Sequence, residues 1–242
     1  MQIKNLGILI VILALTLAAC NINVISGSGN VVTQDRSVNG FKSISMASSG
    51  QLIITQGDQE GLTIEAEDNL MEYIRAEVIL GTLTIDFATE RGRVIRPTRP
   101  IIYHVFVKDL DRVQVDGSGK IEATDLKTSQ LVIEINGSAD TQIGNLQADS
   151  FTYHMSGSGN GQISGQVGEQ SIRIDGSGKY QAGDLESQTA QIQIGGSGEA
   201  TVWAKDQLNV SIGGSGTVNY YGSPQISQNI SGSGKLNSLG EK

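Results

Sequence analysis

Glu134, His154 and Arg173 are the side chains whose types and spacing best fit a catalytic role. They are almost evenly spaced, and each stands three positions before a Gly-Ser-Gly or Gly-Ser-Ala tripeptide. If successive repeats stack in register, these groups lie roughly 4.8 Å apart and could act on a polysaccharide by general acid–base catalysis. Gln114 and Gln193 continue the same series, and an exposed row excludes no water. The sequence therefore favours a solvated row over an active site.

The stretch ERGRVIRPTRP contains the only cluster of basic residues and predicts a polar, proline-bearing loop. Such a cluster could bind an acidic glycan, a lipid headgroup or an acidic partner. Most surface charge has no specific ligand, so a solvated loop is the simpler interpretation. The candidate anion-binding residues are Arg91, Arg93, Arg96 and Arg99.

No pattern in the chain indicates a metal or a cofactor. His104 has no second histidine or cysteine near it in the sequence, so we expect it in a strand and not in a metal site. The Gly-Lys pairs ending at Lys120, Lys179 and Lys235 lack the flanking residues of a phosphate-binding P-loop. The formal net charge of -8 argues against a nucleic-acid partner, which needs a broad basic surface.

The N-terminus predicts a lipoprotein signal peptide over residues 1–19. Lys4 precedes an apolar stretch that is short for a membrane span and ends in Leu17-Ala18-Ala19-Cys20. This pattern resembles a bacterial lipobox, in which the cysteine is lipidated and becomes the mature N-terminus. Cys20 is the only cysteine, so it has no disulfide partner. We expect residues 20–30 to form a lipidated tether that anchors the protein to a bilayer; an ordinary secretory peptide is the alternative.

A tripeptide repeat organises the rest of the chain. Gly-Ser-Gly or Gly-Ser-Ala recurs seven times between Gly117 and Gly234, and apolar residues stand two and four positions before most copies. This alternation predicts a strand with one buried face, followed by a corner, a second short strand and a loop. A period near twenty is typical of a stacked solenoid. The corner glycines are Gly117, Gly119, Gly137, Gly157, Gly159, Gly176, Gly178, Gly196, Gly198, Gly214, Gly216, Gly232 and Gly234.

These patterns predict an all-β parallel solenoid over residues 31–242, in one domain. Residues 111–238 form its regular repeats, and residues 31–110 are an irregular start and cap. In the irregular part, Asp68-Asn69 could cap a helical turn over Leu70 to Ile74, and Glu77 to Asp86 predicts a hairpin through Leu80-Gly81. Apolar residues in phase with the later repeats are Ile44, Met46, Leu52 and Ile54.

The stretches FKSISMASSGQLIITQGD and EAEDNLMEYIRAEVILGTLTI, with the serial GSG corners, resemble the bacterial head GIN domain family (DUF2807), described as putative auto-transporter adhesin heads. The resemblance implies a right-handed, pectin-lyase-like β-helix on a cell-envelope lipoprotein, a role in adhesion and no agreed catalytic residues. We therefore expect a non-catalytic scaffold for a glycan or protein ligand. A polysaccharide-active enzyme and a structural spacer are the alternatives. The sequence leaves open which ligand binds, what the oligomeric state is, and whether the protein faces the periplasm or the cell exterior.

Overall fold

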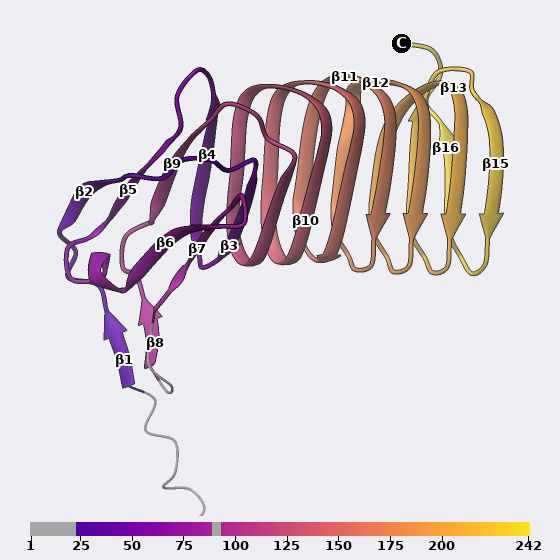
Figure 1. Ribbon diagram of the computed structural model, residues 1–242. Helices are drawn as coiled ribbons and strands as arrows, with labels where there is room; N and C mark the ends of the chain where they lie inside the picture. The colour runs from indigo at the N-terminus through magenta and orange to yellow at the C-terminus, as the bar shows by residue number, and fades with distance from the viewer. Residues whose placement is uncertain (1–22, 89–92) are drawn as a thin grey trace, which may run out of the picture.

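The computed structural model describes residues 23–88 and 93–242, so Cys20 and Arg91 lie outside the described residues. The described chain is all-β apart from one short 3-10 turn. Figure 1 shows a row of successive coils of ribbon, and we call each coil a rung. The strands of the regular rungs are β10 (Arg112–Gly157), β11 (Asn160–Ile174), β12 (Lys179–Ile194), β13 (Glu199–Ile212), β14 (Thr217–Tyr221), β15 (Gln225–Ile230) and β16 (Lys235–Ser238).

Every pairing between these strands is parallel and joins residues about one repeat apart. Ile172 pairs with Ile192, which pairs with Val210, and all three side chains are at most 3 % exposed. Fully burying a side chain of this size contributes roughly 1.5–3 kcal/mol. The alternation of apolar and polar residues thus sets which face of each rung lies inside.

In each repeat, we expect a loop after the short strand that follows the corner, and the structure differs there. Leu126, Leu146 and Leu185 are buried as their spacing indicates, but they lie within strands. The strand β10 continues through two of them without a break. Pairing with the neighbouring rung shifts register at the bend and resumes beyond it, at Leu146 with Gly165 and at Gly165 with Leu185. The chain therefore returns to the ladder where the sequence predicts a loop.

The N-terminal part combines parallel and antiparallel pairings. Its strands β3 (Ser43–Ala47) and β4 (Gly50–Gln56) pair in parallel with the start of β10, as the in-phase apolar residues predict. Beyond them, β7 continues the sheet from β3 and β9 from β4, and antiparallel strands then close it (Figure 1). The remaining elements are β2 (Val31–Arg36), β5 (Gly61–Glu67), η1 (Met71–Tyr73), β6 (Ile74–Ile79), β7 (Thr82–Phe87) and β9 (Ile102–Val107).

Two local predictions in this part have different outcomes. The hairpin is confirmed: β6 and β7 are antiparallel, and Leu80 and Gly81 have φ values of 48° and 77°, as a tight two-residue turn requires. The helical turn forms as the short η1, but the predicted cap is wrong. Asp68 instead accepts hydrogen bonds from Ser28 Oγ (2.5 Å) and Asn30 Nδ2 (2.9 Å), which hold an earlier loop in place.

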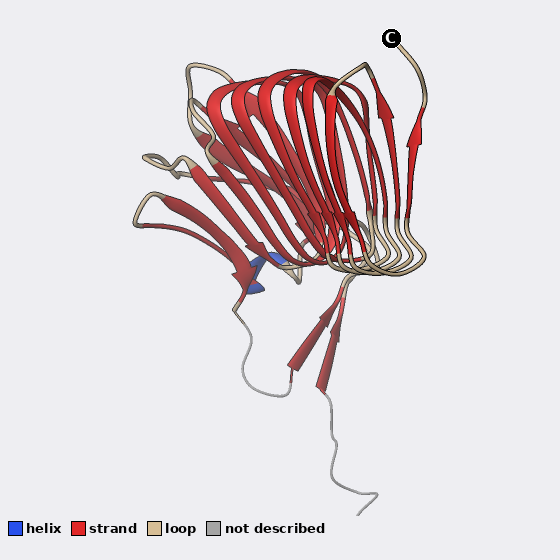
Figure 2. Ribbon diagram, turned by 90° about the vertical axis from the view of Figure 1, so that its right-hand side faces the viewer, coloured by secondary structure: helices blue, strands red, loops and turns tan. Residues whose placement is uncertain are grey.

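A separate two-stranded ribbon corrects the expected arginine loop. β8 (Arg93–Arg96) pairs in parallel with β1 (Asn23–Ser26), within the segment predicted as a tether. Both strands lie at the N-terminal end of the stack (Figure 1) and project away from its body (Figure 2). Nothing in the sequence of ERGRVIRPTRP indicates this pairing, because its partner strand lies at the far end of the irregular part. No helix in the described part of the chain is long and apolar enough to span a membrane.

The buried carboxylate of Glu67 fixes the base of this ribbon. Glu67 is 1 % exposed and accepts hydrogen bonds from the backbone of Gly29 (2.7 Å), Thr98 (2.8 Å) and Arg99 (3.3 Å), and from the Thr98 hydroxyl. Burial raises the pKa of the Glu67 carboxyl, but the hydrogen bonds from Thr98, Gly29 and Arg99 outweigh it and lower the pKa below its ordinary value. Ionised Glu67 therefore ties together two loops that are far apart in the sequence.

Candidate binding surfaces

The corner glycines form a column along one side of the stack. At each of the predicted corner glycines, an added Cβ would lie 3.2 Å or less from an atom of a neighbouring segment. At Gly137 it would lie 2.0 Å from the carbonyl oxygen of Gly117, and φ there is 151°, so two constraints require glycine at that position. The corners therefore lie where successive rungs approach most closely.

Backbone groups at the corners form hydrogen bonds from rung to rung. Serine amides donate to the carbonyl of the previous corner: Ser158 to Gly137 (3.1 Å), Ser177 to Gly157 (3.1 Å) and Ser197 to Gly176 (3.0 Å). A backbone cradle for phosphate needs several N–H groups that point at the anion. Because the serine amides are already used between rungs, the geometry favours an architectural role for these tripeptides.

The Glu134–His154–Arg173 row divides into separate ion pairs. Glu134 lies 2.8 Å from Arg112, on the side of the row away from His154. His154 and Arg173 are register partners on adjacent strands, and both contact Asp175, at 3.0 Å and 2.6 Å. The predicted row exists, but its carboxylate and its imidazole do not face a common point.

The contacts of His154 also differ from those of a catalytic triad. Its Nε2 atom lies 3.0 Å from Asp175 Oδ2 and 3.2 Å from Ser156 Oγ, so the same nitrogen faces both groups. A triad uses one ring nitrogen for the nucleophile and the other for the carboxylate. Hydrogen bonding from Arg173, and then from His154, lowers the pKa of Asp175, whereas a general acid near neutral pH needs a raised one.

The described arginines of the predicted cluster lie on β8 and in the loop that follows it. Arg93 and Arg96 are the two ends of β8, and Arg99 follows in the next loop, where its backbone contacts Glu67. Arg96 and Arg99 are exposed. Within residues 23–88 and 93–242, no three His, Cys, Asp or Glu side chains gather where they could hold a metal ion.

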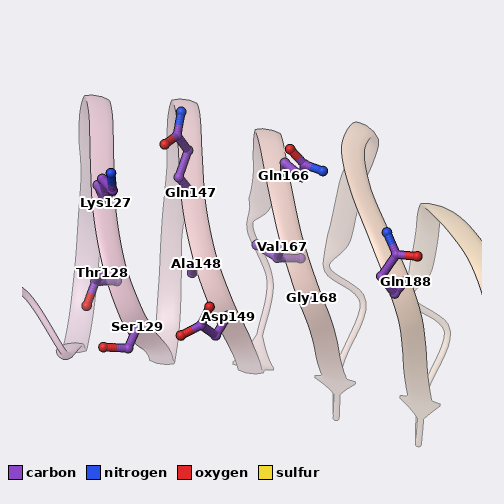
Figure 3. A pocket seen from close by; sticks show the side chains of 10 residues that line it. All are labelled: Lys127, Thr128, Ser129, Gln147, Ala148, Asp149, Gln166, Val167, Gly168 and Gln188. Atoms are coloured by element: carbon purple, nitrogen blue, oxygen red, sulfur yellow. The ribbon is translucent and has the colours of Figure 1, made fainter.

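A groove of about 750 Å³ crosses four neighbouring rungs on another face of the stack. Figure 3 shows its side chains in successive rows, with a glutamine on three of the four rungs. Gln147 pairs in register with Gln166, and Ala148 with Val167, so equivalent groups repeat from rung to rung. The lining residues are Lys127, Thr128, Ser129, Gln147, Ala148, Asp149, Gln166, Val167, Gly168 and Gln188.

Small residues make this groove hollow, and amides give it polar character. Val167 is buried and Ala148 half-buried, while Gly168 lies so close to the previous rung that a Cβ would be 2.6 Å from the Asp149 carbonyl oxygen. Gln147 and Gln166 are exposed above this floor. Each amide offers both donors and an acceptor, and they recur roughly every 4.8 Å. The arrangement suits an extended polar polymer that lies across the rungs.

Sequence reasoning missed the groove because no short motif marks it. The signal is the recurrence of glutamine at Gln147 and Gln166, beside the small residues Ala148 and Gly168, one repeat apart. A smaller hollow of about 280 Å³ lies on the face of the charged row, near the last rungs. Amides and hydroxyls line it as well, namely those of Gln191, Gln193, Asn209, Ser211, Ser227, Gln228 and Asn229.

Comparison with known families gives one match, over residues 40–224, to a family described as "Putative auto-transporter adhesin, head GIN domain". A comparison with curated proteins gave no match.

Several solved structures share the fold. A "putative adhesin" from Bacteroides fragilis superposes with a TM-score of 0.84 and 24 % identity, covering 89 % of this chain and 100 % of that one. A "putative lipid binding protein" from Parabacteroides distasonis has a TM-score of 0.70 and 26 % identity, covering 90 % and 100 %. A "putative adhesin" from Parabacteroides merdae has a TM-score of 0.66 and 20 % identity, covering 90 % and 99 %.

Proposed function

This chain belongs to the head GIN domain family of putative auto-transporter adhesins, and from that premise we propose that it is a cell-envelope lipoprotein that binds a ligand without catalysing a reaction. Lipid on Cys20 anchors it, and its body is a right-handed parallel β-solenoid that presents a binding face. The lipobox-like Leu17-Ala18-Ala19-Cys20 supports the anchor. The parallel pairings, one repeat apart, support the solenoid.

The groove with Gln147 and Gln166 is the binding site, and a glycan is its ligand. The observation that carries this proposal is the pair of exposed amides in register above a floor of small residues. Hydroxyl groups of a sugar can both donate to and accept from such amides. The shallow, open shape suits binding along a chain better than enclosing one small molecule.

An enzymatic role has less support. A catalyst needs groups that converge on one reacting atom and pKa values near the working pH. Here Glu134 faces Arg112, and the lowered pKa of Asp175 keeps it ionised beside His154. We therefore assign this row a structural role on the surface.

Glycan arrays with purified full-length protein test the proposal, followed by titration of any ligand that binds. Changing Gln147→Ala and Gln166→Ala together should weaken binding at least tenfold and leave the melting temperature nearly unchanged. The matched control is Gln162→Ala with Gln181→Ala, because these glutamines are also exposed register partners but lie outside the groove. Equal loss in both variants would reject the groove, and turnover of a bound glycan would reject the non-catalytic role. Mass spectrometry of the N-terminal peptide tests the lipid on Cys20.

A further inference from the structure

The β1–β8 ribbon has two faces of different composition. Its strands form a sheet of their own, with Val24 beside Val94 and Ser26 beside Arg96. Because side chains alternate along a strand, these four residues share one face, and all four are exposed. Val24 and Val94 are 45 % and 50 % exposed, so two neighbouring branched apolar side chains face outward together.

A ribbon of this kind has little stability of its own in water. An isolated two-stranded sheet is at best marginally stable, and this one leaves its two valines uncovered. Glu67 holds the loops at its base, so its position relative to the body is fixed at one end. The exposed valines lie toward the other end, one residue from the first described residue of the chain.

Charge on the ribbon is opposite to that of the rest of the protein. The whole chain has a formal net charge of -8, yet Arg96 at the end of β8 and Arg99 in the loop that follows are both exposed. Among the described residues, the carboxylates at the base of the ribbon are Glu67 and Asp68, which accept hydrogen bonds from backbone amides, hydroxyls and an amide side chain. The guanidinium groups are therefore available to bind phosphate, whose oxygens match their planar fork of donors.

We propose that the exposed face of the β1–β8 ribbon docks on a bilayer that carries anionic phospholipids. Val24 and Val94 enter the boundary between headgroups and acyl chains, and Arg96 and Arg99 bind the phosphates above them. Peripheral segments bind such surfaces by this arrangement, with aliphatic residues below the headgroups and cations at the level of the headgroups.

The anchor supports a bilayer as the occupant, and this step rests on the proposed lipidation. Only three residue steps separate Cys20 from Asn23, which span at most about 10 Å. With lipid on Cys20, the ribbon must therefore begin within about 10 Å of the membrane surface. The valines lie nearer this end than Arg96 does, so the order along the ribbon matches increasing distance from the acyl chains.

Fluorescence quenching by brominated acyl chains tests the proposal. The chain has one tryptophan, so full-length protein with Trp203→Phe and Val94→Trp carries a single probe on the ribbon. Ile226→Trp in the same background is the matched control, because Ile226 is 43 % exposed on β15, at the opposite end of the stack (Figure 1). Both proteins are reconstituted in vesicles of phosphatidylcholine, with and without phosphatidylglycerol.

We expect at least twofold quenching of the Val94→Trp protein in vesicles with phosphatidylglycerol, and almost none of the Ile226→Trp control. Adding Arg96→Glu and Arg99→Glu should abolish the quenching, whereas Lys235→Glu should not. Equal quenching of the two probes, or quenching that ignores phosphatidylglycerol and the arginine changes, would overturn the proposal. Mass spectrometry of the same samples reports lipid on Cys20 separately: quenching without that lipid would keep the ribbon inference and reject the anchor.

Discussion

The regular rungs and the N-terminal part use the same inward-facing apolar residues but hold them in different ways. In the rungs, each strand pairs with its equivalent one repeat later, and every pairing is parallel. In the N-terminal part, β9 pairs in parallel with β4 on one edge, but β5 pairs antiparallel with both β9 and β2. The repeat can therefore extend the stack, but the start of the stack needs a sequence that does not repeat.

Buried polar groups show the same contrast. The rungs contain a compact core network in which Tyr180 donates to Gln170, and Gln170 donates to Ser187, all between neighbouring rungs. The N-terminal part has a buried ionised group, Glu67, that receives donors from two distant loops. Close packing between near neighbours stabilises the first region, whereas long-range ties stabilise the second. Four experiments test this contrast.

The largest expected effect comes from the corner column. Gly137→Val should destabilise the protein by about 3 kcal/mol or more, because its Cβ meets a backbone oxygen at 2.0 Å and φ is 151°. Gly178→Val should cost about 1–3 kcal/mol, since the atom 2.0 Å away there is the sulfur of the flexible Met155 side chain. Chemical denaturation measures both values. A Gly137→Val protein as stable as wild type would show that the rungs can separate at their corners.

A smaller effect is expected from buried hydroxyls. Tyr180→Phe and Tyr103→Phe should each cost about 1–2 kcal/mol, because each loses a 3.1 Å hydrogen bond, to Gln170 or to Ser48. Tyr153→Phe should change stability by less than about 0.5 kcal/mol, since its buried hydroxyl makes no hydrogen bond of normal geometry to a described residue. Thermal melts compare the three. A loss for Tyr103→Phe far below that for Tyr180→Phe would mean that buried hydroxyls stabilise the rungs more than the N-terminal part.

Acid should affect the N-terminal part through Glu67. Its folded-state pKa is below the ordinary value, so its contribution is fully present above the unfolded pKa of about 4.3 and is lost as the pH falls through the lower, folded value. Glu67→Gln should therefore lower the melting temperature at pH 7, and the gap to wild type should narrow below about pH 4. Asp175→Asn, at a surface ion pair of the rungs, should show a smaller gap. A gap for Glu67→Gln that stays constant from pH 7 to pH 3 would contradict the assigned ionisation.

The smallest effects are expected on the outer face of the rungs. Gln193→Ala should change stability by no more than about 0.5 kcal/mol, and Lys179→Ala by at most about 1 kcal/mol. Lys179 lies 3.9 Å from Glu199 on the next rung, and both side chains are about half exposed. A loss in either variant as large as that of a buried tyrosine hydroxyl, measured by urea unfolding, would show that surface contacts between rungs stabilise the stack as much as its core does.

The sequence predicted the parts of the fold that depend on local periodicity. Ile172, Ile192 and Val210 lie inside because apolar residues alternate before each corner. Leu80-Gly81 forms a turn because Gly81 accepts positive φ and the turn joins two strand-forming runs, although it also places Leu80 at a φ of 48°. The pairing of β8 with β1 could not be predicted in this way. It depends on tertiary contacts of Glu67, whose own sequence neighbours give no sign of its partners.

The candidate sites show the same difference between what local spacing predicts and what depends on tertiary contacts. Spacing correctly placed His154 beside Arg173, but the partner of Glu134 is Arg112, which the spacing did not single out. The groove escaped prediction because its shape depends on the small size of two residues, Ala148, which packs against the core, and Gly168, which is exposed. Periodicity shows which residues face inward but not where a surface is hollow. A hollow on a surface is a property of several rungs together, and no single repeat encodes it.

The direction of the hydrogen bonds between rungs has a mechanical consequence. These bonds run along the row of coils, whereas the strands run across it. Tension along the row therefore loads the ladders in series, and the weakest contact between neighbours opens first. Each released coil of about 20 residues adds up to roughly 70 Å of extended chain. The body would lengthen stepwise under such a force, at a rate set by the unfolding of single coils.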